Sequence, residues 1–209
     1  MTDETEQIAA AHRQVGTRAL ETGPGRTVAI ARTYDADIDD VWTACTDPGR
    51  LRRWFLPVSG DLRLGGRYHL EGNASGTIER CDPPNGFEAT WEFGGDVSRI
   101  EVRLTPVSGE RTRLELTHIA PDNEHWTEYG PGAAGVGWDI GLRALGVHLR
   151  GLEVPREEDW AATEEGVRFM ALSSERWGEA DIAGGTDPAD ARARARRTAA
   201  FYTAAPSGD

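Results

Sequence analysis

The strongest constraint on the fold is a change of hydrophobic period along the chain. Between residues 62 and 119, apolar and polar residues alternate with period two. Between residues 135 and 150, the apolar residues follow helical spacing instead. That helical stripe is formed by Trp138, Leu142, Leu145 and Leu149. Period two indicates strands with one buried face, and a 4-3-4 stripe is typical of a helix that faces a core. We therefore expect a run of antiparallel strands followed by one long helix.

Turn signals divide the alternating region into five strands. The predicted strands cover residues 67–71, 76–81, 87–93, 99–104 and 113–118, and the strongest turn between them is Asp82-Pro83-Pro84-Asn85-Gly86. A further strand is expected from Thr27 to Tyr34. Two short helices should follow it, one capped by Asp37 and one that begins at Asp47-Pro48 and runs through Trp54.

The two ends of the chain differ from this middle part. Residues 1–25 are predicted to be a mobile lead-in with a short helix between Ile8 and Leu20. The region 121–131 is predicted to be a polar loop. After Pro155 the pattern is helical, with a break at Gly184-Gly185 and a last helix that begins at Asp187-Pro188. We therefore divide the chain into a lead-in (1–25), a main domain (26–150) and a helical C-terminal extension (151–209).

This order of elements indicates an α+β domain, because strands and helices occur in separate runs. A sheet of about six or seven strands with one apolar face has to bury that face, and the long helix is the only element of suitable size. A curved sheet wrapped around one helix does not contact it everywhere. We therefore expect a cavity between sheet and helix that encloses a small apolar molecule.

Several short motifs resemble one known family. They are Val41-Trp42-x-Ala44, Thr46-Asp47-Pro48, Leu51-x-x-Trp54, Leu62-Arg63-Leu64-Gly65-Gly66-Arg67-Tyr68, Asp82-Pro83-Pro84, Ala89-Thr90-Trp91, and Gly137-Trp138 with Leu142. Over about residues 26–150 the chain resembles the heat-shock-protein-90 ATPase activator homology family. The resemblance implies the START-like, helix-grip fold of the SRPBCC superfamily, which includes lipid-transfer proteins and polyketide cyclases. The segment from residue 155 resembles extensions of some bacterial members.

Strand and helix periodicity predicts which side chains line the cavity, and Trp42, Trp54 and Phe55 could close one end of it. The candidate ligand-binding residues are Trp42, Trp54, Phe55, Tyr68, Leu70, Ile78, Trp91, Phe93, Val102, Leu116, His118, Trp138 and Leu142. Each of them could also be ordinary core. Cavity lining is better supported for the set than for any single member, because the fold needs a gap somewhere. The indole N–H and phenol O–H groups also need hydrogen-bond partners, which a ligand could supply.

His118 and Tyr68 are the candidates for a catalytic role. His118 alternates in phase with Leu116, so it should lie on the concave side, where an imidazole could orient a ligand or transfer a proton. A hydrogen-bonded core histidine is the simpler alternative. His69 is out of phase and is expected on the outer face. Because no set of residues indicates a nucleophile, we favour a protein that is not an enzyme.

Other site types have little support in the sequence. His118, Asp122, Glu124 and His125 are close along the chain, but a polar loop does not hold metal ligands rigidly, so we expect neither a metal nor another cofactor. Cys45 is expected to be buried and unreactive. Arg32 and Arg80 are candidates for contacting an acidic ligand at the mouth of the cavity.

Composition narrows the partners. The net charge of −12 and the pI of about 4.9 argue against nucleic acid, which binds basic surfaces. No apolar stretch is long enough to span a membrane. The two cysteines and the polar N-terminal segment favour a cytoplasmic location. We expect a small apolar molecule as the partner, with a homodimer through the C-terminal extension as a further possibility.

Three functions are compatible with these features. The first is binding of a hydrophobic or aromatic metabolite, of lipid or polyketide type. The second is a cyclase or dehydratase that acts in the same cavity. The third is a chaperone-accessory or stress-response interaction, which the family resemblance and the C-terminal extension suggest.

Overall fold

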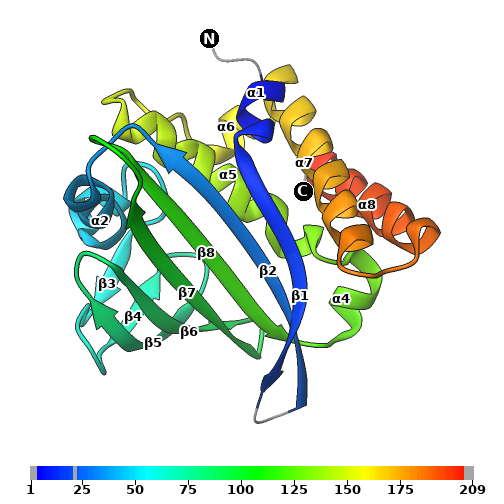
Figure 1. Ribbon diagram of the computed structural model, residues 1–209, viewed down its shortest axis with the longest axis horizontal. Helices are drawn as coiled ribbons and strands as arrows, with labels where there is room; N and C mark the ends of the chain where they lie inside the picture. Colours follow the sequence, from blue (N-terminus) through cyan, green and yellow to red (C-terminus); the bar gives the residue numbers. More distant parts are fainter. Residues whose placement is uncertain (1–3, 21–22, 205–209) are drawn as a thin grey trace.

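One curved antiparallel sheet wraps around a long helix (Figure 1). The computed structural model describes residues 4–20 and 23–204. Within them the eight strands lie in the order β1-β2-β8-β7-β6-β5-β4-β3. The strands are β1 (Ala11–Leu20), β2 (Gly23–Tyr34), β3 (Val58–Gly60), β4 (Arg67–Leu70), β5 (Ser75–Asp82), β6 (Gly86–Phe93), β7 (Asp96–Pro106) and β8 (Thr112–Pro121). The predicted α+β helix-grip fold is confirmed, with eight strands instead of about six or seven.

The helices surround this sheet. They are α1 (Glu4–Ala9), α2 (Ile38–Thr46), α3 (Pro48–Leu51), α4 (Glu124–Tyr129), α5 (Gly132–Leu149), α6 (Glu157–Ala161), α7 (Glu164–Ala183) and α8 (Pro188–Thr203). Helix α5 is the predicted core-facing helix: Leu142 is 4% exposed and Leu145 is fully buried. The predicted cap of α2 is also present, because the Asp37 side chain accepts a hydrogen bond from the backbone N–H of Asp40.

The predicted N-terminal helix is wrong for most of its length, because the helix present there is α1 and ends at Ala9. Residues 11–20 are not helical but form the edge strand β1, which pairs with β2 from Ala11 opposite Arg32 to Leu20 opposite Gly23. Long-range pairing overrides the weak local pattern here, as is common for strands. Residues 1–3 and 21–22 of the predicted lead-in, and 205–209 of the predicted extension, lie outside the described residues.

Three other boundaries differ from the predictions. The polar loop 121–131 contains helix α4, whose first turn is capped by Asn123 and whose Trp126 is buried. Helix α3 ends at Leu51, before Trp54. The helix after Pro155 is divided into α6 and α7, because the Thr163 side chain accepts from the backbone N–H of Gly166 and starts a new helix.

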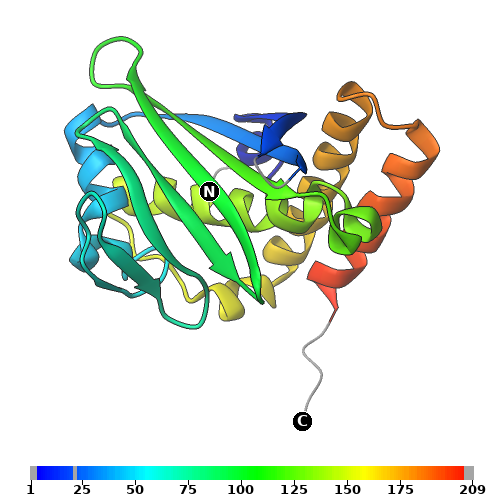
Figure 2. The same cartoon turned by 90° about the horizontal axis from the view of Figure 1, so that it is seen from below.

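The C-terminal extension packs against the rest of the chain. Helices α7 and α8 lie together at one end of the molecule, beside α5 (Figure 2). A Cβ atom at Gly135 of α5 would lie 2.2 Å from the Trp177 ring of α7, so only glycine allows this close contact. The apolar residues Phe169, Met170 and Trp177 are thereby buried within the chain. The division at residues 25 and 150 and a homodimer through the extension stay predictions.

The apolar core has two parts. The larger part joins β2, β8, α5 and α7, and the smaller part contains Tyr68, Leu70, Ala89 and Ile100 of the outer strands. Trp138 of α5 packs against both. The fold therefore places this tryptophan where the helix leaves the closely packed core and faces the outer strands.

Candidate functional site

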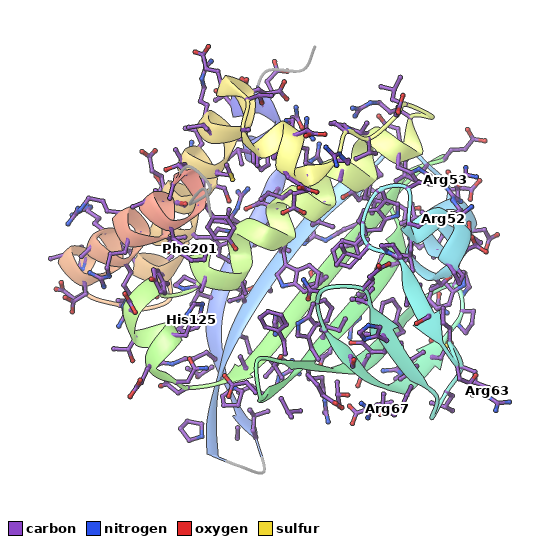
Figure 3. The ribbon with its side chains drawn as sticks, turned by 180° about the vertical axis from the view of Figure 1, so that it is seen from behind. Arg52, Arg53, Arg63, Arg67, His125 and Phe201 are labelled. Carbon is purple, nitrogen blue, oxygen red and sulfur yellow. The ribbon has the colours of Figure 1, made fainter. Side chains whose placement is uncertain are left out.

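A cavity of about 380 Å³ lies on the side of α5 that faces strands β4–β8. Its walls come from α5, from the segment between residues 42 and 62, and from the inward faces of the strands. Figure 3 shows α5 lying across these strands, with side chains from both between them. The volume lies within the range of pockets that hold small molecules, about 300–1,000 Å³.

Most of the predicted residues line this cavity. They are Trp42, Trp54, Phe55, Tyr68, Leu70, Ile78, Trp91, Val102, Leu116, Trp138 and Leu142. Strand parity and the helical stripe of α5 found most of them, whereas Trp42 of α2 and Trp54 and Phe55 after α3 were predicted to close one end of the cavity.

The prediction for Phe93 is wrong. Phe93 shares the inward face of β6 with Trp91, but it is the last residue of that strand and pairs with Asp96 across the turn. Its side chain is 58% exposed, because no other element covers the sheet at the turn. Parity fixes the face of a strand residue but not whether anything lies above it.

His118 lies behind the cavity wall and does not line the cavity. Its ring centroid is 5.8 Å from that of Trp138 and 6.2 Å from that of Trp91. Trp138 Nε1 donates to His118 Nδ1 at 3.1 Å, and His118 Nε2 lies 2.8 Å from Ser98 Oγ. Both ring nitrogens are therefore occupied within the protein.

These contacts determine the tautomer of His118. An indole N–H can only donate, so Nδ1 must accept and the ring proton must be on Nε2. The Nε2–H group then donates to Ser98 Oγ, and the Ser98 hydroxyl donates to the carbonyl of Trp91 at 3.1 Å. Burial lowers the pKa of His118 to about 4, which keeps the ring neutral. This chain of donors holds Trp138 and Trp91 in place.

Tyr68 lines the cavity, but its hydroxyl is also occupied. It donates to the carbonyl of Thr90 at 2.6 Å, and burial raises the pKa of Tyr68. Neither of the two candidate catalytic residues presents a free acid or base to the cavity in this arrangement. The proton transfer considered for His118 and Tyr68 stays a prediction without support from the geometry.

Aromatic rings form much of the cavity wall. Trp54 and Phe55 lie 5.4 Å apart, Phe55 and Trp138 are stacked at 6.4 Å, and Trp138 meets Trp91 edge to face at 5.3 Å. Trp54 Nε1 donates to the carbonyl of Ala44. The indole N–H groups of Trp42 and Trp91 have no acceptor in the described ranges 4–20 and 23–204. Neither indole nitrogen is fully buried.

A β-bulge places residues that sequence reasoning missed. The register of β5 against β6 shifts between Ile78 and Arg80, which reverses the faces of the residues that follow. Cys81 therefore lines the cavity, whereas Arg80 pairs with Glu88 on the other face of the sheet. Arg32 does not line the cavity either. The prediction that Arg32 or Arg80 lies at its mouth is wrong.

Other lining residues were missed for local reasons. Phe87 has the same parity as Trp91 and could have been identified, whereas Val58 and Leu62 lie on a short strand and a loop that show no period. Cys45 also lines the cavity, although only as a half-buried residue, and burial raises its pKa to about 12. His69 lies on the exposed face as predicted. Across the described part of the chain, no group of His, Cys, Asp or Glu side chains could hold a metal ion.

Solved structures of similar proteins share this architecture. The crystal structure of CalU16 from Micromonospora echinospora matches this chain with a TM-score of 0.69 and a sequence identity of 38%. The match covers 82% of this chain and 98% of the CalU16 chain. Its solution structure gives a TM-score of 0.71. An HSP90 activator from Plasmodium falciparum is 25% identical over 59% of this chain and 96% of its own, with a TM-score of 0.53.

A third protein shows the fold alone. DynU16, from the dynemicin biosynthetic locus, is 22% identical over 61% of this chain and 48% of its own, with a TM-score of 0.54.

No helix in residues 4–20 or 23–204 is both long and apolar enough to cross a membrane.

Sequence comparison identifies the family. None of the curated proteins matches the chain. The profile of the family described as "Activator of Hsp90 ATPase homolog 1-like protein" matches residues 35–150, more than half of the chain. The likeness to CalU16 covers a larger share of the chain than this profile. The chain therefore belongs to the Activator of Hsp90 ATPase homolog 1-like family.

Proposed function

We propose that the protein binds a small apolar, ring-containing metabolite in the cavity between the sheet and α5. The observation that carries this proposal is the aromatic wall of the cavity, formed around Trp138 with its ring neighbours Trp91 and Phe55. Burying apolar ligand surface there would contribute about 25 cal/mol per Å². Flat rings also gain from stacked and edge-to-face contacts.

The polar groups around the cavity favour binding over catalysis. The Tyr68 hydroxyl, the Trp54 indole and the His118 ring all have partners within the protein. An apolar ligand would therefore leave few polar groups unpaired. Satisfied groups of this kind shape a binding surface, whereas acid–base catalysis needs a group that can exchange a proton with the ligand.

The free indole N–H groups of Trp42 and Trp91 refine the expected ligand. Both residues line the cavity, and neither N–H has an acceptor among the residues that the structure describes. A carbonyl, ether or phenol oxygen on the ligand would satisfy such a donor. We therefore favour an aromatic compound with one or two oxygen substituents over a plain hydrocarbon chain.

Gly141 provides a direct test of this proposal. It lines the cavity from α5, and the nearest atom to a Cβ built there is Phe55 Cε2 at 3.9 Å, so a larger side chain would extend into the cavity. The test measures binding of 1-naphthol, anthraquinone and dodecanol by calorimetry and by thermal shift. We expect the aromatic compounds to bind and Gly141→Leu to weaken them at least about tenfold, a loss of about 1.4 kcal/mol.

The matched control is Gly137→Ala on the same helix. A Cβ atom at Gly137 would lie 3.5 Å from the Tyr202 hydroxyl, outside the cavity. Both substitutions raise helix propensity, by about 1 kcal/mol relative to glycine, so a general change of helix stability affects both variants. Equal binding by the Gly141→Leu variant, or no binding of any of the three compounds by the unsubstituted protein, would contradict the proposal.

A further inference from the structure

Strand β2 carries an arginine on its helix-facing side. Ile30, Arg32 and Tyr34 alternate along β2 and therefore share one face of the sheet. The Tyr34 hydroxyl donates to the carbonyl of Leu142 at 2.9 Å, so this face is turned toward α5. Arg32 is partly buried there, with its guanidinium 5.7 Å from the centre of the Tyr34 ring. It has no carboxylate partner among the described residues.

Helix α5 presents two more arginines beside Arg32. Arg143, Gly146 and Arg150 follow at spacings of three and four, so they lie on one face of the C-terminal end of the helix. A Cβ atom at Gly146 would lie 3.8 Å from Arg32 Nη2. The guanidinium of Arg32 therefore rests against the helix at Gly146, between the arginines one turn before and one turn after it.

Arg143 is held in place, but only part of its guanidinium group has hydrogen-bond partners. Its side chain is only 9% exposed, its Nη2 donates to Glu165 at 3.1 Å, and its guanidinium lies 3.9 Å from the centre of the Trp160 ring. Its Nε is buried without an acceptor. Burial lowers the pKa of Arg143, Glu165 opposes this shift, and the positive charges of Arg150 and Arg32 add to it. Arg32 and Arg150 therefore both lie close enough to act on Arg143.

The local charge is unbalanced. Glu165 is the carboxylate that pairs with this group of arginines, and it is itself 39% exposed. Asp139, one turn earlier on α5, is already paired with Arg13 through both of its oxygens. The whole chain carries a net charge of −12, so a group of three arginines with one carboxylate is unlike its average surface. Such a local excess of positive charge attracts anions.

We propose that Arg32, Arg143 and Arg150 form a binding site for a small oxyanion, a phosphate or carboxylate group. The site lies between β2, the C-terminal end of α5 and α6, at the end of the sheet where β2 ends (Figure 1). It is distinct from the cavity, which Trp138 and Leu142 line from another face of α5. Guanidinium groups suit this role because they offer paired N–H donors to two oxygens at once.

Calorimetry on the full chain tests this site with two probes. Sodium phosphate and sodium citrate are titrated separately at constant ionic strength, and the tighter of the two shows which oxyanion class the site prefers. We expect saturable binding of at least one probe. Arg32→Gln and Arg150→Gln should each weaken it at least about tenfold, because each removes a charged hydrogen-bond donor.

Arg63→Gln is the matched control. It removes the same charge from an arginine whose side chain is 80% exposed and which lies in the loop between β3 and β4 (Figure 3). Binding should therefore stay within about twofold of that of the unsubstituted protein. The proposal is overturned if neither probe binds at concentrations up to about 20 mM, or if Arg32→Gln and Arg150→Gln bind as the Arg63→Gln variant does. The Arg32 and Arg150 variants carry the test because Arg143, the most buried of the three, is left intact.

Discussion

The two sides of helix α5 differ in how completely they are filled. On the side toward β1 and α7, Asp139 is 3% exposed and accepts hydrogen bonds from Arg13, Ser173 and Trp177. On the side toward the outer strands, Trp138 and Gly141 border a cavity of about 380 Å³. One helix therefore combines a closely packed polar contact with an open aromatic surface.

This difference shows where the fold has stability and where it has room for function. A buried carboxylate is tolerated only when its counter-charge and hydrogen-bond donors are present. The side chains around Asp139 therefore have one favourable arrangement. The cavity side tolerates empty space because its residues are mostly apolar, and the Tyr68 hydroxyl and the Trp54 indole bond to backbone carbonyls. A strained or mobile region is not needed to explain a binding site here, since incomplete contact between sheet and helix is sufficient.

The largest effect should come from breaking the packed side. Asp139→Ala leaves Arg13, whose side chain is 5% exposed, without its counter-charge, and it leaves the N–H of Trp177 without an acceptor. We expect a loss of about 3–5 kcal/mol in the free energy of unfolding, measured by urea denaturation. The cavity should persist in the fraction that stays folded.

A surface pair provides the control for this substitution. Asp61 and Arg63 form an ion pair at 2.8 Å, but their side chains are 50% and 80% exposed. Asp61→Ala should change stability by less than about 1 kcal/mol, because exposed pairs contribute little. A loss below about 1 kcal/mol in the Asp139→Ala variant would show that the two sides of α5 do not differ as described.

The same contrast explains what the sequence could predict. Most of the cavity wall follows from local rules, since strand parity places Tyr68 and Trp91 inward and helical spacing places Trp138 and Leu142. The Asp139 network does not follow from local rules, because Arg13 lies 126 residues away in a segment predicted to be helical. The bulge that turns Cys81 inward likewise depends on how β5 pairs with β6.

An intermediate effect is expected from acid on the cavity side. The pKa of His118 is about 4 in the folded protein, below its usual value of 6.5. Between these values the unfolded chain binds a proton that the folded chain does not, so stability falls as the pH is lowered from about 6.5 to about 4. At about 1.4 kcal/mol per pH unit, the loss approaches about 3 kcal/mol.

Urea denaturation at pH 7 and pH 4.5 measures this loss. His118→Gln removes the titrating ring, so the variant should lose less stability between the two pH values than the unsubstituted protein, although it is less stable at pH 7. His69→Gln is the control, because His69 is exposed and contacts Ser75 at the surface. An unchanged pH dependence in the His118→Gln variant would mean that Trp138 is not held by a neutral imidazole.

The smallest effect concerns the two thiols, which lie at different depths of the cavity wall. Cys81 is exposed, whereas Cys45 is half-buried and has its pKa raised to about 12 by burial. Because the thiolate is the reactive form, only about one in ten thousand Cys45 groups is reactive at pH 8. Iodoacetamide should therefore alkylate Cys81 first, as followed by mass spectrometry, with a change in stability below about 0.5 kcal/mol.

A bound aromatic compound should slow the alkylation of Cys81 a few-fold, because Cys81 also lines the cavity. The rate for free N-acetylcysteine, measured with the same compound, corrects for direct quenching of the reagent. If Cys45 reacts as fast as Cys81, the cavity side of α5 opens to water far more often than the packed side. The two sides would then differ in how much they move as well as in how tightly they are packed.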